Sequence, residues 1–184
     1  AAFGTIKGID EKRHAVSAVL SSNELDRYGE IVDPMGFKDY LDRFRSNPVL
    51  LAQHDHDRVL GHWENMRVTK NTFEGDAIFD DGDDAAMLSF GKYQRGHMKA
   101  FSVGFIAHKW AWMEVPGEKG EKVRVRKFTA SEPLEGSAVS VPANPAALAR
   151  ALGTLRDADD PESVASMLSQ GDIEALLNAL RPEI

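Results

Sequence analysis

The chain of 184 residues contains no cysteine, which excludes disulfides, cysteine nucleophiles and thiolate metal sites together. It also has no apolar run near the ~20 residues that span a bilayer, so no membrane association is expected. Basic residues are the minority, with 22 Lys and Arg against 29 Asp and Glu and a net charge of -7. Such an acidic chain is a poor candidate for wrapping a nucleic-acid backbone, which requires clustered Lys and Arg.

A phosphate-binding glycine pattern between a strand and a helix is also missing, so we expect no nucleotide chemistry and no cofactor. Alternation of apolar and polar residues is frequent and predicts several short strands. These strands are expected over residues 15–20, 48–53, 67–79 with a turn at 70–71, 98–108, 122–129 and 134–141. The Pro- and Gly-containing segment 116–120 predicts a turn between two of them.

Helical spacing occurs between the predicted strands. Phe37, Tyr40, Leu41 and Phe44 follow i, i+3, i+4 and i+7 spacing, which predicts an amphipathic helix. Acidic residues at 81–84 favour a helix start, so a second helix is expected over 83–94. Further helices are expected over 145–152, where Pro145 opens the helix, and in two short amphipathic pieces between 164 and 180.

Many short strands with a few helices indicate an α+β domain, and frequent alternating strands favour a closed, antiparallel-rich β-barrel over an open sheet. After Gly153 the composition becomes polar and acidic. Residues 1–152 are therefore predicted to form the main domain, and residues 153–184 an acidic linker with C-terminal amphipathic helices.

The segment from Met98 to Phe105 contains a serine of interest. If it is a strand, Phe101, Val103 and Phe105 share one face, and Ser102 lies on the other with small neighbours. A backbone could approach such a serine closely. The simpler interpretation is a structural serine beside a packing glycine.

An apolar strand over 48–53 ends in His54, followed by Asp55, His56 and Asp57. One interpretation is a metal site built on His54 and His56 with an aspartate or His62, although a His-x-His pair is a weak signal. The other is that His54 acts alone as a general base, since histidine titrates near neutral pH.

The segment from Leu134 to Pro145 places Glu135 on the same strand face as Ser137, Val139 and Val141. If the two valines face the core, Glu135 is drawn inward as well. A buried carboxylate needs a partner, and a histidine is a suitable one because the carboxylate stabilises its protonated form. The alternative is a structural glutamate that accepts backbone hydrogen bonds.

Together these segments resemble the tailed-phage prohead serine proteases, over about residues 15–152. The resemblance rests on five features in the same order, none of which is specific alone. They are Asp26 to Pro34 with Gly36-Phe37, Pro48 to Asp55 followed by Val59-Leu60-Gly61, Ala77 to Phe79 followed by the Asp-rich helix start, Phe101 to Phe105, and Leu134-Glu135 through Val141-Pro142-Ala143-Asn144-Pro145.

This resemblance implies a fold similar to the herpesvirus assembly proteases, a closed β-barrel ringed by helices. It implies a serine endopeptidase with Ser102 as nucleophile, His54 as base and Glu135 as the third catalytic residue. His108 and His97 rank below Glu135 as third residue, since the herpesvirus enzymes use a second histidine there.

The implied partners are the major capsid protein and its scaffold segment, cleaved in the host cytoplasm inside the immature capsid, and self-cleavage is also expected. A homo-oligomer is expected too. The alternative function is a catalytically silent capsid assembly or scaffold factor on the same fold.

Overall fold

The structure is a computed structural model that describes residues 8–117, 120–144 and 147. The chain divides into two units, residues 1–152 and 153–184, and every described residue belongs to the first. The predicted domain boundary, the helix expected over 145–152 apart from Ala147, and the expected C-terminal helices lie outside the described residues. None of the described helices is long and apolar enough to cross a membrane.

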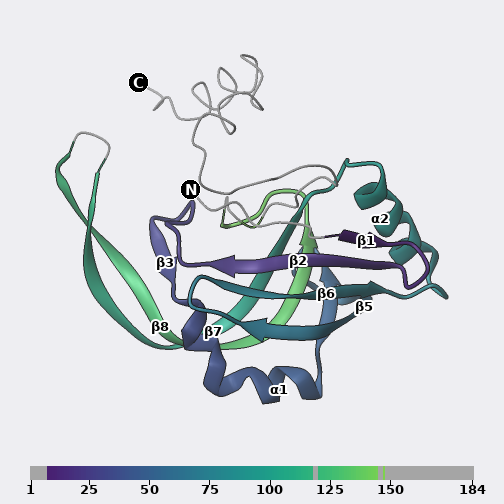
Figure 1. The fold of residues 1–184 in the computed structure, drawn as a ribbon, viewed down its shortest axis with the longest axis horizontal. Coiled ribbons are helices and arrows are strands. Elements are labelled where there is room, and N and C mark those ends of the chain that lie inside the picture. The colour runs from purple at the N-terminus through teal and green to yellow at the C-terminus, as the bar shows by residue number, and fades with distance from the viewer. Residues whose placement is uncertain (1–7, 118–119, 145–146, 148–184) are drawn as a thin grey trace, which may run out of the picture. The chain divides into compact units, whose positions relative to one another are not determined.

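The described unit is a mixed α+β fold dominated by one sheet of eight strands (Figure 1). The strand order is β1-β2-β6-β5-β4-β8-β3, and β7 pairs with β8. Both pairings of β8 with β3 and β4 are parallel, and the other pairings are antiparallel. The strands are β1 (Gly8–Asp10), β2 (Ala15–Ser22), β3 (Glu30–Val32), β4 (Val49–Ala52), β5 (Asp55–Val68), β6 (Thr72–Phe79), β7 (Ala100–Pro116) and β8 (Lys122–Val139).

The α+β class was predicted correctly, but the predicted closed barrel is not supported, because the sheet is open. Strands β2 and β7 approach each other, yet the described residues form no backbone ladder between them. The N–H of Phe101 on β7 donates instead to the carbonyl of Ala147, at 3.2 Å. A closed barrel requires every strand edge to be paired, and here this part of the β7 edge bonds to the chain beyond β8.

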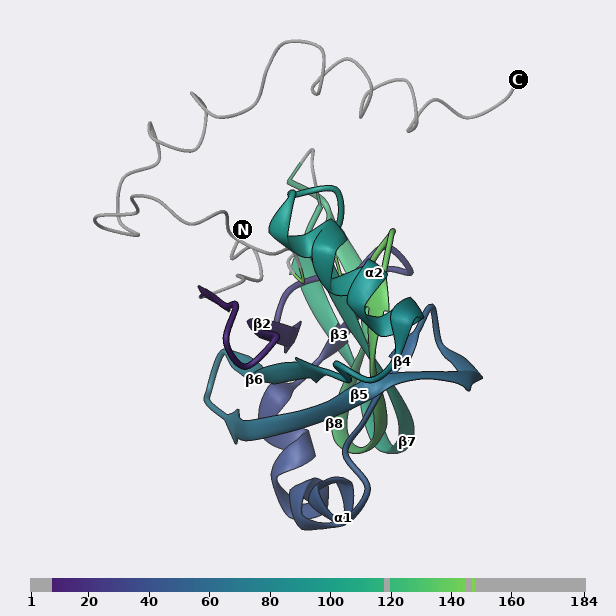
Figure 2. The same cartoon turned by 90° about the vertical axis from the view of Figure 1, so that its right-hand side faces the viewer.

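Three helical segments lie beside the sheet: the 3₁₀ helix η1 (Pro34–Tyr40), α1 (Leu41–Ser46) and α2 (Asp84–Gln94). The helix predicted over 83–94 is confirmed, and Asp83 caps it by accepting a hydrogen bond from the Ala85 N–H at 2.7 Å. The single helix expected around Phe37 to Phe44 is divided between η1 and α1. Figure 2 shows α2 and α1 at different ends of the sheet.

The hydrophobic core is rich in aromatic side chains. Phe37 lies against Phe73 with ring centroids 5.0 Å apart, and Phe101 contacts both Trp63 and Tyr93 at 5.2 and 4.7 Å. Aromatic side chains bury large areas and add a preference for particular ring geometries. Phe101 is therefore fixed in the core, and β7 is anchored at the point where Ser102 follows.

Strands β7 and β8 form a long hairpin that extends beyond the rest of the sheet (Figure 1). The turn predicted at 116–120 includes residues 118 and 119, which lie outside the described residues; on either side of it Pro116 lies opposite Lys122. The two strands expected over 122–129 and 134–141 are one continuous strand, which ends at Val139. Pro133 lies within this strand although it has no N–H to donate to a ladder. The register shifts between Gly104 and Phe105, so that Phe105 lies opposite Pro133 and the ladder continues past the proline.

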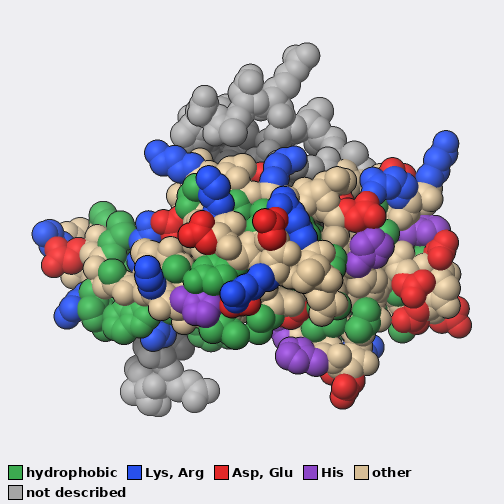
Figure 3. All heavy atoms as spheres, turned by 90° about the horizontal axis from the view of Figure 1, so that it is seen from below, with side chains coloured by type: hydrophobic (Ala, Val, Ile, Leu, Met, Phe, Trp, Pro, Cys, Tyr) green, Lys and Arg blue, Asp and Glu red, His purple; other side chains and the backbone are tan. Residues whose placement is uncertain are grey.

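The outer part of this hairpin is exposed and carries Trp110 and Trp112. Arg124 lies over the Trp112 ring at 4.5 Å, and Arg126 lies over the Trp110 ring at 5.9 Å. Figure 3 shows hydrophobic and basic side chains side by side at this end. The stacked guanidinium groups shield part of the indole surface, as cation–π contacts do.

Candidate active site

Three neighbouring strands bring the predicted site residues into one region. On the β7–β8 ladder Ser102 lies opposite Ser137, and Gly104 lies opposite Glu135. On the other edge of β8, Leu51 of β4 lies opposite Ser137. His54 follows β4 by two residues, so the end of β4 carries it to β8. Segments far apart in the sequence are thus joined through β8, the central strand of the three.

Glu135 is buried, with 3% of its surface exposed, and both of its carboxylate oxygens are bonded. Oε1 lies 2.6 Å from His54 Nδ1, and Oε2 accepts a hydrogen bond from Ser137 Oγ at 2.6 Å. A carboxylate removed from water needs such partners to remain ionised. The predicted pairing of Glu135 with a histidine therefore has a direct geometric counterpart in His54.

Two glycines make room for this carboxylate and its strand. A Cβ at Gly104 would collide with Glu135 Oε1, so Glu135 occupies the space that a side chain on β7 would fill. A Cβ at Gly136 would collide with the indole ring of Trp63. Trp63 Nε1 also donates a hydrogen bond to the Gly136 carbonyl, at 3.1 Å. Trp63 in the core thus holds β8 in place at Gly136, the residue directly after Glu135.

His54 lies in a tight backbone turn directly after β4. Gln53 and His54 have positive φ angles of 55° and 61°, a backbone conformation that residues other than glycine rarely adopt. Each such residue costs about 1–3 kcal/mol and persists only where the surroundings hold it. Here the Gln53 N–H donates to the Ala138 carbonyl at 2.9 Å, and the His54 N–H donates to Ser137 Oγ at 3.1 Å.

The hydrogen bond with Glu135 raises the pKa of His54, partial burial lowers it, and the charge of Glu135 raises it further, so that the net pKa is above the ordinary value. The His54 side chain remains 43% exposed. When the Nδ1–H of neutral His54 donates a hydrogen bond to Glu135, the free lone pair of the imidazole is on Nε2. This arrangement suits a base that takes a proton from a neighbouring group and holds it as a stabilised imidazolium.

Ser102 lies on β7 with 6% of its surface exposed. Its neighbour Phe101 is in the core, and the Ala100 carbonyl accepts a hydrogen bond from the buried Tyr93 hydroxyl at 2.6 Å. Among the described residues Ser102 Oγ has no hydrogen bond, to His54 or to any other group. Hydrogen bonds between a nucleophile and its base are often long without substrate and tighten when substrate binds.

The other histidines considered from the sequence have different surroundings. His108 Nε2 lies 2.9 Å from Glu132 Oε2, and the His108 ring stacks on Tyr40. His56, His62 and His97 are exposed. No group of three His, Asp or Glu side chains in the described ranges is arranged to hold a metal ion. His56 and His62 both lie on β5.

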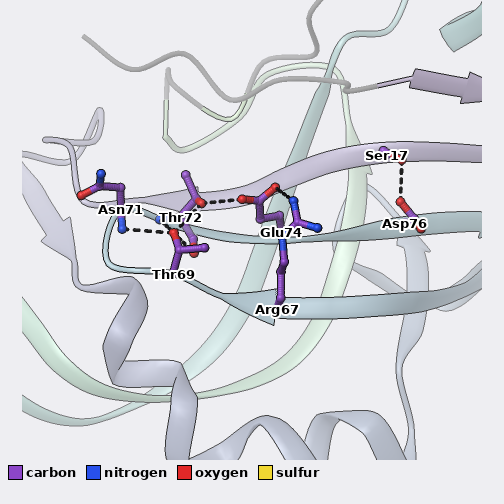
Figure 4. A network of polar contacts seen from close by, with 7 residues as sticks. All are labelled: Ser17, Arg67, Thr69, Asn71, Thr72, Glu74 and Asp76. Carbon is purple, nitrogen blue, oxygen red and sulfur yellow. Dashed lines mark hydrogen bonds and ion pairs between the residues drawn. The ribbon is translucent and has the colours of Figure 1, made fainter.

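A second polar cluster links β2, β5, β6 and the turn between β5 and β6 (Figure 4). Buried Glu74 pairs with Arg67 at 2.9 Å and accepts a hydrogen bond from the Thr72 hydroxyl at 2.8 Å. Ser17 donates to Asp76 at 2.5 Å. The seven residues drawn there include a serine but no histidine that could act as its base. We therefore interpret this cluster as structural, since its hydrogen bonds join β5, β6 and the turn between them.

Sequence reasoning missed the part that Ser137 plays in the site. Alternation had already placed Ser137 on the same face as Glu135, but a strand serine carries no other signal. The structure shows that its hydroxyl contacts both Glu135 and the backbone of His54. It likewise shows that Gly104 accommodates the Glu135 carboxylate, where the sequence had suggested room for an approaching backbone.

Comparison with known proteins gives a family match and two curated relatives. Residues 14–161 match the family described as caudovirus prohead serine protease. The chain is 29% identical over 145 residues to the prohead protease of Escherichia phage T5, which covers 76% of this chain and 65% of that protein. It is 26% identical over 145 residues to the capsid polyprotein of Pseudomonas phage PAJU2, which covers 76% of this chain and 20% of that protein.

The chain thus spans less than two thirds of the length of each of these relatives. No solved structure matches it. The family match, in contrast, covers most of the chain and includes every strand from β2 to β8. The chain therefore belongs to the caudovirus prohead serine protease family.

Proposed function

We propose that this chain is a serine endopeptidase in which Ser102 is the nucleophile, His54 the general base and Glu135 the residue that orients His54. The observation that carries the proposal is the 2.6 Å contact between His54 Nδ1 and the buried Glu135 Oε1. Family membership supports the same chemistry. So does the position of Ser102 on β7, directly opposite Ser137, which contacts both other residues.

In this mechanism Ser102 Oγ attacks the carbonyl carbon of a peptide bond and passes its proton to Nε2 of His54. Glu135 accepts the Nδ1–H hydrogen bond and stabilises the imidazolium that forms. His54 then returns the proton to the departing amine, which leaves an acyl-enzyme on Ser102. A water molecule, activated by His54, hydrolyses this ester. Backbone amides stabilise the oxyanion in both steps.

We further propose that the substrates are the major capsid protein and its scaffold segment, and that the enzyme acts inside the immature capsid. The names of the two relatives, a prohead protease and a capsid polyprotein, support this assignment. Self-cleavage and a homo-oligomeric state are parts of the same proposal. Sedimentation analysis of the purified chain will measure the oligomeric state.

The proposal is tested by incubating the chain with its cognate capsid precursor and mapping the products by mass spectrometry. Ser102→Ala and His54→Ala are each expected to abolish cleavage without unfolding the chain. The double variant is expected to be no worse than either single variant, because the two residues act as one unit. Circular dichroism and thermal unfolding provide the folding control.

Cleavage by Ser102→Ala at the native rate would contradict the serine mechanism. Loss of cleavage on chelation, restored by zinc, would support the metal-site interpretation of His54 and His56 instead. A native chain that assembles with capsid protein but cleaves nothing would favour the silent assembly factor.

A further inference from the structure

We propose that Ser137 is a positioning residue for the catalytic pair, because its single hydroxyl fixes both the Glu135 carboxylate and the backbone of His54. This inference rests on the proposed function, since it assigns Ser137 a role through the base and its partner. It adds a fourth residue to the site.

The hydrogen-bonding roles at Ser137 follow from the chemistry of its two partners. The His54 N–H can only donate, so Ser137 Oγ accepts from it at 3.1 Å. An ionised carboxylate can only accept, so the hydroxyl proton points to Glu135 Oε2 at 2.6 Å. One orientation of the hydroxyl satisfies both contacts, and the two bonds reinforce each other.

The consequence for Glu135 is a fixed rotation of its carboxylate. Ser137 holds Oε2, which leaves Oε1 directed at His54 Nδ1. Without this donor, the carboxylate could rotate and share its oxygens with other donors. The catalytic bond would then be formed for a smaller part of the time.

The consequence for His54 is a held backbone. His54 follows Gln53 in a turn in which both residues have positive φ angles, and such a conformation persists only when its surroundings enforce it. The bond from the His54 N–H to Ser137 is one of two described hydrogen bonds by which backbone N–H groups of this turn donate to β8, the other being from the Gln53 N–H to the Ala138 carbonyl. Ser137 therefore positions the imidazole from the backbone side and from the carboxylate side.

The location of Ser137 argues for this role over mere burial of a polar side chain. It has no exposed surface, and it lies between Ser102 on β7 and Leu51 on β4. Ser131, on the same strand, is also fully buried, yet its hydroxyl has no hydrogen-bond partner among the described residues. Ser131 is thus a matched control for the loss of a buried strand hydroxyl.

The test uses the full chain and a fluorophosphonate probe, which reacts only with an activated serine and needs no identified substrate. Ser102 Oγ bonds to phosphorus, fluoride leaves, and the serine proton passes to His54. We expect Ser137→Ala to lower the maximal labelling rate by about 10- to 100-fold, the range found for hydrogen-bond partners that orient metal-ligating histidines, with little change in probe affinity. Ser131→Ala should label at the native rate, and Ser137→Thr should restore most of it.

A second readout does not depend on reactivity. The proton between His54 Nδ1 and Glu135 should give a downfield NMR resonance in the native chain, and Ser137→Ala should weaken or lose it. If Ser137→Ala fails to fold, Ser137→Cys takes its place, because it keeps the buried volume and has only a weak donor. Ser137→Cys should then label slowly and weaken or lose the downfield resonance.

Two failures are distinguishable. If Ser102→Ala is still labelled, the proposed mechanism is wrong. The role of Ser137 is overturned if Ser102→Ala is not labelled while Ser137→Ala or Ser137→Cys labels like the native chain and keeps the downfield resonance. In that case the proposed mechanism still stands.

Discussion

Gly104 of β7 lies directly opposite Glu135 of β8, and the Glu135 carboxylate occupies the space that a side chain at position 104 would fill. This relationship joins the strand of Ser102, the proposed nucleophile, to the strand of Glu135. It also means that the position of the carboxylate depends on a residue that has no side chain.

Gly104→Ala is therefore expected to displace Glu135 and to lower the fluorophosphonate labelling rate of Ser102. Overpacking at a filled site typically costs about 1–3 kcal/mol, so the free energy of unfolding should fall as well. Gly8→Ala on β1 is the matched control, because a Cβ there meets no atom within 4 Å. Native labelling by Gly104→Ala would show that Glu135 can move without consequence.

Glu135→Gln should keep the shape of the site but lose the charge that stabilises protonated His54. We expect the labelling rate to fall roughly 10²- to 10⁴-fold, the range usual for general-base catalysis. The pH midpoint of the remaining rate should move to lower pH, because the interaction that raises the pKa of His54 is gone. An active Glu135→Gln together with an inactive His108→Ala would assign the third role to a histidine.

The stability of the fold should depend on pH through the same pair. The pKa of His54 is raised in the folded chain, so its stabilising contribution is fully present below the unfolded pKa of about 6.5. This contribution decreases as pH rises through the folded pKa. Urea unfolding between pH 5 and pH 9 should show the decrease in the native chain, and Glu135→Gln should lack it.

Tyr93→Phe should destabilise the chain without touching the proposed catalytic residues. The Tyr93 hydroxyl donates to the Ala100 carbonyl at 2.6 Å in the core, and loss of such a hydrogen bond costs about 0.5–1.5 kcal/mol. Urea unfolding measures the loss. Tyr28→Phe is the control, since the Tyr28 side chain is 77% exposed, and an equal loss in both variants would contradict the argument.

Deletion of residues 154–184 is expected to leave a folded chain that still labels at Ser102, with altered association. The predicted linker and helices there lie outside the described residues, so this expectation comes from composition alone. Thermal unfolding, probe labelling and sedimentation measure the three properties. Deletion of 162–184, beyond the family match, is the comparison, and collapse of both forms would place the tail in the core.

Local patterns in the sequence determined where most of the strands and the helix α2 lie. Alternation located β2, β4, β6 and β7, and acidic capping located α2, because these signals come from neighbouring residues. Most of strand β5 was missed, since Asp55 to Val59 is exposed and shows no apolar alternation; only its end, Arg67 and Val68, fell within the strand predicted over 67–79. The continuity of β8 was missed, because the ladder passes Pro133 through a register shift between Gly104 and Phe105 on β7, and no local pattern indicates that shift.

For the candidate site, too, the sequence identified individual residues, and the tertiary structure decided how they contact one another. The sequence indicated Ser102, His54 and Glu135 as chemically suitable residues. Burial of Glu135 was expected because it shares a strand face with Val139 and Val141, of which Val139 is buried and Val141 is exposed. Only the tertiary structure brought Glu135 to His54, 81 residues away, through the parallel pairing of β4 with β8. Likewise, only the tertiary structure decided that the sheet stays open and that Ser137 bonds to both residues. Such contacts depend on strand register, which is set by long-range packing and leaves no local trace in the chain.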